Sequence, residues 1–93
     1  MQQTYTIPAK QSGTGSIHDI ASEHGDRIIR FAPGTVYAVV LASYYRGKGY
    51  TTHKTVAATL AAAYRNRDYS HQIIDSAGNR YIANHWSSQL IRE

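Results

Sequence analysis

The chain has 93 residues, a net charge of +4 and no cysteine, and 42% of its residues are hydrophobic. This length supplies one core only, so the sequence predicts a single domain over residues 1–93. The absence of cysteine excludes disulfide scaffolds, thiolate zinc sites and thiol nucleophiles. Residues 1–10 lack a basic segment followed by an apolar one, and no apolar run reaches the roughly 18 residues of a membrane span. We therefore expect a soluble, intracellular protein without membrane contact.

Large aliphatic side chains are scarce in this composition. The hydrophobic residues include many alanines and eight tyrosines. Small domains with thin cores gain stability from packed aromatic rings or from association. We therefore expect stability to rest on Tyr and Trp packing or on self-association, and a homodimer is left open.

The first half of the chain predicts short elements separated by turns. Thr4–Ile7 alternates β-branched and aromatic residues before Pro8, which predicts a strand. Ser16–Gly25 begins with an N-capping serine and ends at a glycine, which predicts a two-turn helix. Arg27–Phe31 predicts another short strand. Thr35–Tyr45 favours a strand through its β-branched residues, although a helix stays open there.

An alanine-rich helix is the clearest predicted element. It covers Lys54–Asn66, and Thr51 or Thr52 is the expected N-cap. Its apolar stripe consists of Val56, Leu60, Ala63 and Tyr64. The many alanines predict close packing on a sheet.

A hairpin is predicted near the end of the chain. His71–Asp75 and Arg80–Asn84 are strand-like segments joined by a turn in which Gly78 or Asn79 supplies a positive φ. Trp86 is expected to fold back onto the core. The predicted fold class is therefore α+β: an alanine-rich helix packed on an antiparallel sheet with a C-terminal β-hairpin.

The arrangement of reactive side chains argues against catalysis. Ser70, His71 and Asp75 are neighbours on one predicted hairpin, where alternation sends adjacent side chains to opposite faces. A zinc site built from His53, His71 and His85 is the one metal arrangement left open, because no histidine pair has helical i, i+4 spacing. We therefore expect a protein that is not an enzyme and needs no cofactor or metal.

The strongest functional feature is the stretch from Tyr44 to Tyr69, Tyr64 included, in which basic residues and tyrosines are interleaved. No acidic residue lies between Asp26 and Asp68. Basic side chains neutralise phosphates and tyrosines stack on bases, but Tyr and Arg also dominate protein–protein hot spots. The ordinary alternative is that Tyr64 and either Tyr44 or Tyr45 are in the core and the charges only solubilise the protein. The predicted partner-binding residues are Tyr45, Arg46, Lys48, Tyr50, Lys54, Arg65, Arg67 and Tyr69.

A winged helix-turn-helix regulator is an alternative that would make the protein a direct DNA- or RNA-binding protein. If Thr35–Tyr45 is helical, Gly47–Tyr50 becomes the turn, Thr52–Arg67 the recognition helix and His71–Asn84 the wing.

In its layout over Thr52–Trp86, an alanine-rich helix leading into a hairpin, the chain resembles the small phage-encoded anti-CRISPR inhibitor proteins. The resemblance implies a non-enzymatic, stoichiometric inhibitor in the cytoplasm of a bacterial host. Such a protein docks on a CRISPR effector nucleoprotein complex and blocks its DNA binding or nuclease step. Many members are acidic DNA mimics, whereas this chain is basic, which favours docking on an acidic protein surface or on the guide RNA.

Overall fold

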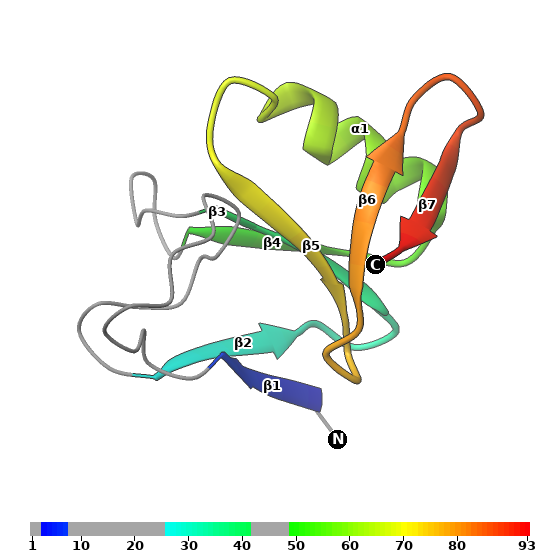
Figure 1. The fold of residues 1–93 in the computed structure, drawn as a ribbon. Coiled ribbons are helices and arrows are strands. Elements are labelled where there is room, and N and C mark those ends of the chain that lie inside the picture. The colour runs from blue at the N-terminus through cyan, green and yellow to red at the C-terminus, as the bar shows by residue number, and fades with distance from the viewer. Residues whose placement is uncertain (1–2, 8–25, 42–48) are drawn as a thin grey trace.

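The computed structural model describes residues 3–7, 26–41 and 49–93, and over these residues the chain is an α+β domain with one helix and two antiparallel sheets (Figure 1). One sheet has the order β1-β2 and the other β4-β3-β5-β6-β7. The predicted fold class is confirmed. The elements are β1 Gln3–Ile7, β2 Arg27–Phe31, β3 Tyr37–Leu41, β4 Tyr50–His53, α1 Val56–Arg65, β5 His71–Asp75, β6 Arg80–Asn84 and β7 Gln89–Arg92.

The five-stranded sheet is covered on both faces near β3 and β5. On one face, Ala38, Val40 and Ile74 pack against residues of the β1–β2 sheet, including Ile29 and Phe31. On the other face, side chains of β3 and β5 meet α1. This second cluster contains Val39, Ile73, Ala62 and Ala63. The alanines Ala62 and Ala63 are buried where the helix packs on the sheet, as predicted.

The ambiguous segment Thr35–Tyr45 contains β3, which lies between β4 and β5 in the five-stranded sheet. Ala38, Val39 and Val40 are all buried, because α1 covers one face of this strand and β1–β2 the other. A strand buried on both faces has a continuous apolar run instead of alternation, which explains why its sequence also permits a helix. The first helix of the helix-turn-helix alternative is therefore a strand, and that arrangement is wrong for this chain.

Helix α1 begins later than predicted. The side chain of Thr55 is the N-cap and accepts a hydrogen bond from the Ala58 N–H at 3.1 Å. The predicted caps Thr51 and Thr52 lie instead in β4, a strand that sequence patterning did not predict. Their β-branched side chains suit the ladder with β3, in which Thr51 pairs with Val39.

The predicted hairpin is confirmed at its predicted bounds, and Gly78 supplies the positive φ (86°). Two further expectations are wrong: Trp86 projects from the β6–β7 turn into solvent, and Tyr64 of the predicted apolar stripe is exposed. Strand β7 was not predicted. The predicted helix Ser16–Gly25 lies outside the described residues. No helix in the described part of the chain is long and apolar enough to cross a membrane.

Candidate macromolecule-binding site

The structure disperses the predicted partner-binding residues that it describes. Tyr50 is half-buried against the core, and its hydroxyl accepts a hydrogen bond from the Arg30 N–H at 3.0 Å. Lys54 precedes α1 and lies beside the β2–β3 turn, where a Cβ added at Gly34 would be 3.5 Å from its Cε. Arg65 ends the helix, so about 15 Å of helix separates these two charges. Tyr45, Arg46 and Lys48 lie outside the described residues.

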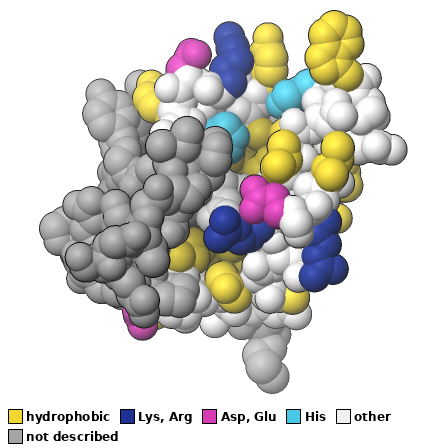
Figure 2. All heavy atoms as spheres, in the orientation of Figure 1, with side chains coloured by type: hydrophobic (Ala, Val, Ile, Leu, Met, Phe, Trp, Pro, Cys, Tyr) yellow, Lys and Arg dark blue, Asp and Glu magenta, His cyan; other side chains and the backbone are white. Residues whose placement is uncertain are grey.

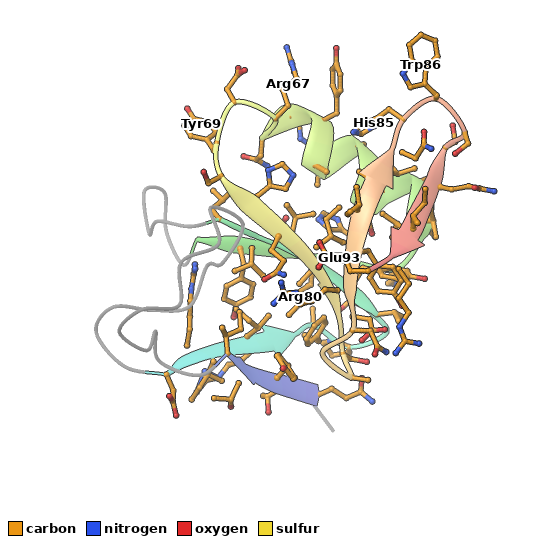
Figure 3. All side chains as sticks on the ribbon, in the orientation of Figure 1. Arg67, Tyr69, Arg80, His85, Trp86 and Glu93 are labelled. Carbon is orange, nitrogen blue, oxygen red and sulfur yellow. The ribbon has the colours of Figure 1, made fainter. Side chains whose placement is uncertain are left out.

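Arg67 and Tyr69 are brought together in the connection between α1 and β5. The Arg67 guanidinium lies 4.2 Å from the centre of the Tyr64 ring and donates to the Tyr64 carbonyl at 2.9 Å. The Tyr64 ring in turn meets His85 edge to face, with centroids 5.6 Å apart. His85 and Trp86 belong to the β6–β7 turn, so two segments distant in sequence meet at one end of the molecule (Figure 3).

We call this surface the aromatic edge and define it by Tyr64, Arg67, Tyr69, His85 and Trp86. Tyr64 is 54% exposed, Tyr69 49% and Trp86 101%. Figure 2 shows hydrophobic, basic and histidine side chains gathered along the side of the molecule that carries α1 and the β6–β7 turn. Large aromatic side chains grouped on a surface are typical of a contact site for another molecule.

The backbone that presents Trp86 is held in place by Asn84. The Asn84 side-chain oxygen accepts hydrogen bonds from the Trp86 N–H at 3.1 Å and the Ser87 N–H at 3.2 Å. This Asx-type capping fixes the start of the turn. Ser88 then adopts a positive φ of 54°, which returns the chain into β7. The tryptophan is therefore presented from an ordered turn, which lowers the entropy lost on binding.

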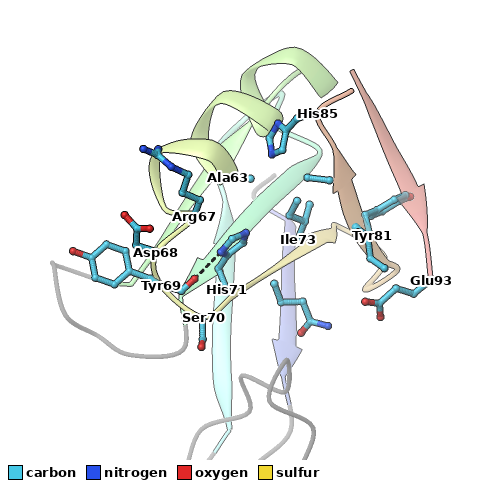
Figure 4. A pocket seen from close by; sticks show the side chains of 13 residues that line it. Ala63, Arg67, Asp68, Tyr69, Ser70, His71, Ile73, Tyr81, His85 and Glu93 are labelled. Atoms are coloured by element: carbon cyan, nitrogen blue, oxygen red, sulfur yellow. Dashed lines mark hydrogen bonds between the residues drawn. The ribbon is translucent and has the colours of Figure 1, made fainter. Parts of the chain in front are cut away.

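A cleft opens beneath the aromatic edge because β5 and β6 diverge. Their ladder consists of Ile73 paired with Tyr81 and Ile74 with Arg80, and the strands then separate (Figure 1). The opening encloses about 580 Å³. Figure 4 shows Arg67 and Tyr69 at one rim, with His85 above. The lining residues with chemical function include Arg67, Tyr69, His71, Tyr81, His85 and Glu93.

The His71 ring is oriented by a backbone carbonyl. Its Nδ1 lies 2.9 Å from the Tyr69 carbonyl oxygen. Because a carbonyl only accepts, Nδ1 carries the proton and Nε2 is the acceptor in the neutral ring. The cleft therefore offers a hydrogen-bonding imidazole beside a tyrosine and an arginine, which suits a polar side chain of a partner.

The side of the cleft formed by β6 is fixed by a buried carboxylate at the β5–β6 turn. Asp75 accepts hydrogen bonds from the Tyr81 hydroxyl at 2.7 Å, from the Asn79 side chain and backbone at 2.9 Å, and from the Ala77 N–H at 2.9 Å. Burial alone raises the pKa of Asp75, but hydrogen bonds from Asn79, Tyr81 and the backbone outweigh it and lower the pKa. The hydrogen bond to Asp75, followed by burial, raises the pKa of Tyr81.

The catalytic and metal-binding sets considered from the sequence do not assemble. Asp75 is engaged with Asn79 and Tyr81, and His71 with a carbonyl, so Ser70, His71 and Asp75 form no triad. His71 and His85 line the cleft, but His53 does not. Within residues 3–7, 26–41 and 49–93, no group of three His, Asp or Glu side chains is placed to hold a metal ion.

Sequence reasoning selected two members of the aromatic edge, Arg67 and Tyr69, as partner-binding residues. Tyr64 belonged both to the basic–aromatic stretch and to the apolar stripe and was not selected, Trp86 was assigned to the core, and His85 was considered only as a metal ligand. One signal was present: Asn84 followed by His85, Trp86 and two serines is turn chemistry, which places a tryptophan at a tip. No protein-family model matches the chain, and comparisons with curated proteins and solved structures show no significant similarity.

Proposed function

We propose that this chain is a non-enzymatic, stoichiometric binding protein that docks through the aromatic edge on a protein surface of a bacterial nucleoprotein complex. The observation that carries the proposal is the exposure of Tyr64, Tyr69 and Trp86 beside Arg67 on a hydrogen-bonded backbone. The layout resemblance to anti-CRISPR proteins suggests a CRISPR effector complex as the target. Docking would block DNA binding or the nuclease step by occupying the surface.

The chemistry of the aromatic edge is that of a protein–protein hot spot. Trp, Tyr and Arg are the residues enriched in hot spots, and burying one such anchor contributes on the order of 2–4 kcal/mol. Tyr64 and Arg67 are already stacked, so little side-chain freedom is lost on binding. A partner with an apolar pocket for Trp86 and an acidic or hydroxyl group for Arg67 would match this surface.

Direct nucleic-acid binding is the second candidate, because exposed aromatic rings beside an arginine also stack on bases. The charge around the edge favours the protein partner. Arg67 is followed by Asp68, which offsets its charge, and Lys54 lies at the other end of α1. The two candidates differ in salt dependence, since neutralising several phosphates makes affinity fall steeply with salt.

The deciding experiment uses the tagged protein to retain partners from bacterial lysate, with and without nuclease, followed by titration of the purified partner. We expect a defined complex that survives nuclease and that W86A binds at least about 30-fold more weakly. I28A is the matched control, because Ile28 is an exposed large side chain on β2, away from the edge. Both variants should melt like the parent protein.

Two results would refute the proposal. Undiminished binding by W86A would remove the aromatic edge from the interface. Release of all bound material by nuclease, with affinity falling steeply as salt rises, would show that the protein binds nucleic acid directly.

A further inference from the structure

Strand β7 leaves one edge of the five-stranded sheet open. It is the last strand in the order β4-β3-β5-β6-β7, and no described strand pairs with its outer side. Its Ile91 pairs with Ile82 of β6, and both side chains are exposed although they are large and apolar. Figure 2 shows hydrophobic side chains on this face of the molecule, in the region of β6 and β7. An open edge bordered by apolar side chains is a template for another strand.

The hydrogen bonds of the β6–β7 hairpin show which residues face the open edge. The Glu93 N–H donates to the Arg80 carbonyl at 2.9 Å, so Glu93 is turned toward β6. Backbone groups of successive residues point to opposite sides of an antiparallel strand. Gln89 and Ile91 are therefore also turned toward β6, and the backbone groups of Leu90 and Arg92 point outward.

We propose that two copies of this chain associate by antiparallel pairing of their β7 strands, with Ile91 opposite the partner subunit's Ile91. In this register, Leu90 and the partner subunit's Arg92 exchange both backbone hydrogen bonds, as their outward orientation requires. Ile91 then forms a non-hydrogen-bonded pair on the two-fold axis, where side chains come closest. The two sheets become one continuous sheet, and Ile82 and Ile91 of both copies form one apolar cluster.

Charge selects this register over its neighbours. Side chains on one face of the sheet must stay together, so the register can shift only in steps that keep this parity. One such shift places Arg92 opposite the partner subunit's Arg92, which is a repulsive like-charge pair. The opposite shift brings Arg92 against the turn residue Ser88 and separates the two Ile91 side chains. The proposed register instead places Gln89 opposite the partner subunit's Glu93, which is a polar pair that can hydrogen-bond.

A second copy fits this edge better than an unrelated strand because the edge is complementary to itself. The same Ile91 is the central contact on both sides, and the Arg80–Glu93 ion pair at 3.2 Å stays within each copy. The aromatic edge is not part of the dimer contact, since His85 and Trp86 lie in the turn before β7. The dimer therefore does not rest on the proposed function, and each copy keeps its own docking surface.

The chain contains no cysteine, so a single introduced cysteine reports this contact directly. Residues in a non-hydrogen-bonded pair have Cα atoms about 4.5 Å apart, within the range that a disulfide spans. We expect the parent protein to sediment at twice its 10.4 kDa mass. We also expect I91C to form a disulfide-linked dimer at least about tenfold faster than I28C, because pairing raises the effective concentration. Ile91 and Ile28 are matched in exposure, at 46% and 47%.

R92C tests the register. In the proposed register Arg92 faces the partner subunit's Leu90, so the two Arg92 residues are not opposite each other and R92C should cross-link more slowly than I91C. A monomeric mass at high concentration, or equal rates for I91C and I28C, would overturn the proposal. R92C cross-linking faster than I91C would overturn the register and with it the Ile91 contact. A monomer whose I91E variant loses partner binding would assign the edge to the partner's strand and would also overturn the proposal.

Discussion

Replacing Asp75 by asparagine tests whether the hairpin that forms one side of the cleft depends on a buried carboxylate. The substitution keeps the side-chain size but places an amide N–H₂ where one carboxylate oxygen accepts hydrogen bonds from Asn79 and Tyr81. Hydrogen bonds to a charged group contribute about 1.5–3 kcal/mol each, and their losses are not additive. We expect D75N to lower the free energy of unfolding by about 2 kcal/mol, which corresponds to a fall in Tm of roughly 10 °C.

The pH dependence gives this prediction a second, independent readout. The pKa of Asp75 is lower in the folded protein than in the unfolded chain. Its contribution is therefore fully present above the unfolded pKa of about 3.9 and is lost as the pH falls through the folded pKa. The stability difference between the parent protein and D75N should be constant near pH 7 and shrink below about pH 4.

Urea unfolding followed by circular dichroism between neutral and acid pH measures both effects. D68N is the control, because Asp68 is an exposed carboxylate whose replacement should change stability by no more than about 0.5 kcal/mol. A D75N variant as stable as D68N at pH 7 would refute the reasoning. So would a stability difference that stays constant into acid, because the charge of Asp75 would then not be its source.

Two further predictions concern a turn and a histidine. Gly78→Ala should destabilise the protein by about 2 kcal/mol more than Gly34→Ala in urea unfolding. Both glycines have a positive φ, but only a Cβ at Gly78 would overlap the Tyr5 ring. Equal losses of stability in the two variants would show that Tyr5 moves aside freely. Burial, and then the charge of Arg65, lower the pKa of His53. Stability should therefore fall as the pH drops through about 6.5, which is the pKa of histidine in the unfolded chain. In His53→Gln the urea midpoint should change less between neutral pH and pH 5 than it does in the parent protein. An equal change of the midpoint in both proteins would contradict this.

The parts of the fold that were predicted correctly are those specified by neighbouring residues. The β5–β6 hairpin combines two short alternating segments with a glycine whose positive φ the turn requires. The alanine-rich helix also follows from local propensity. Strand β4 was missed because Tyr50–His53 has a polar pattern and becomes a strand through its ladder with β3, which is a long-range contact. Strand β7 forms a local hairpin with β6, and it was missed because Trp86 was assigned to the core and no turn was predicted there.

The sequence predicted the residue types of the candidate site better than it predicted which residues come together. Basic residues and tyrosines do form a binding surface in the proposal, but the fold sends Lys54 to one end of α1 and Arg67 to the other. His85 and Trp86 join Arg67 only through the register of β6, which no local pattern reveals. Hydrophobicity alone assigned Trp86 to the core, whereas its turn holds it in solvent.

The buried Arg27 of β2 has a consequence for how this protein can be altered. Its guanidinium donates to the carbonyls of Leu41 and Gly49, and the Leu41 N–H donates to the same Gly49 carbonyl at 2.8 Å. The two positions that flank residues 42–48 are thus fastened to each other and to a second sheet. Closing a longer segment between fixed ends costs only a few tenths of a kcal/mol per added residue or less. The domain is therefore suited to grafting, with foreign sequences inserted between Leu41 and Gly49 of a cysteine-free scaffold.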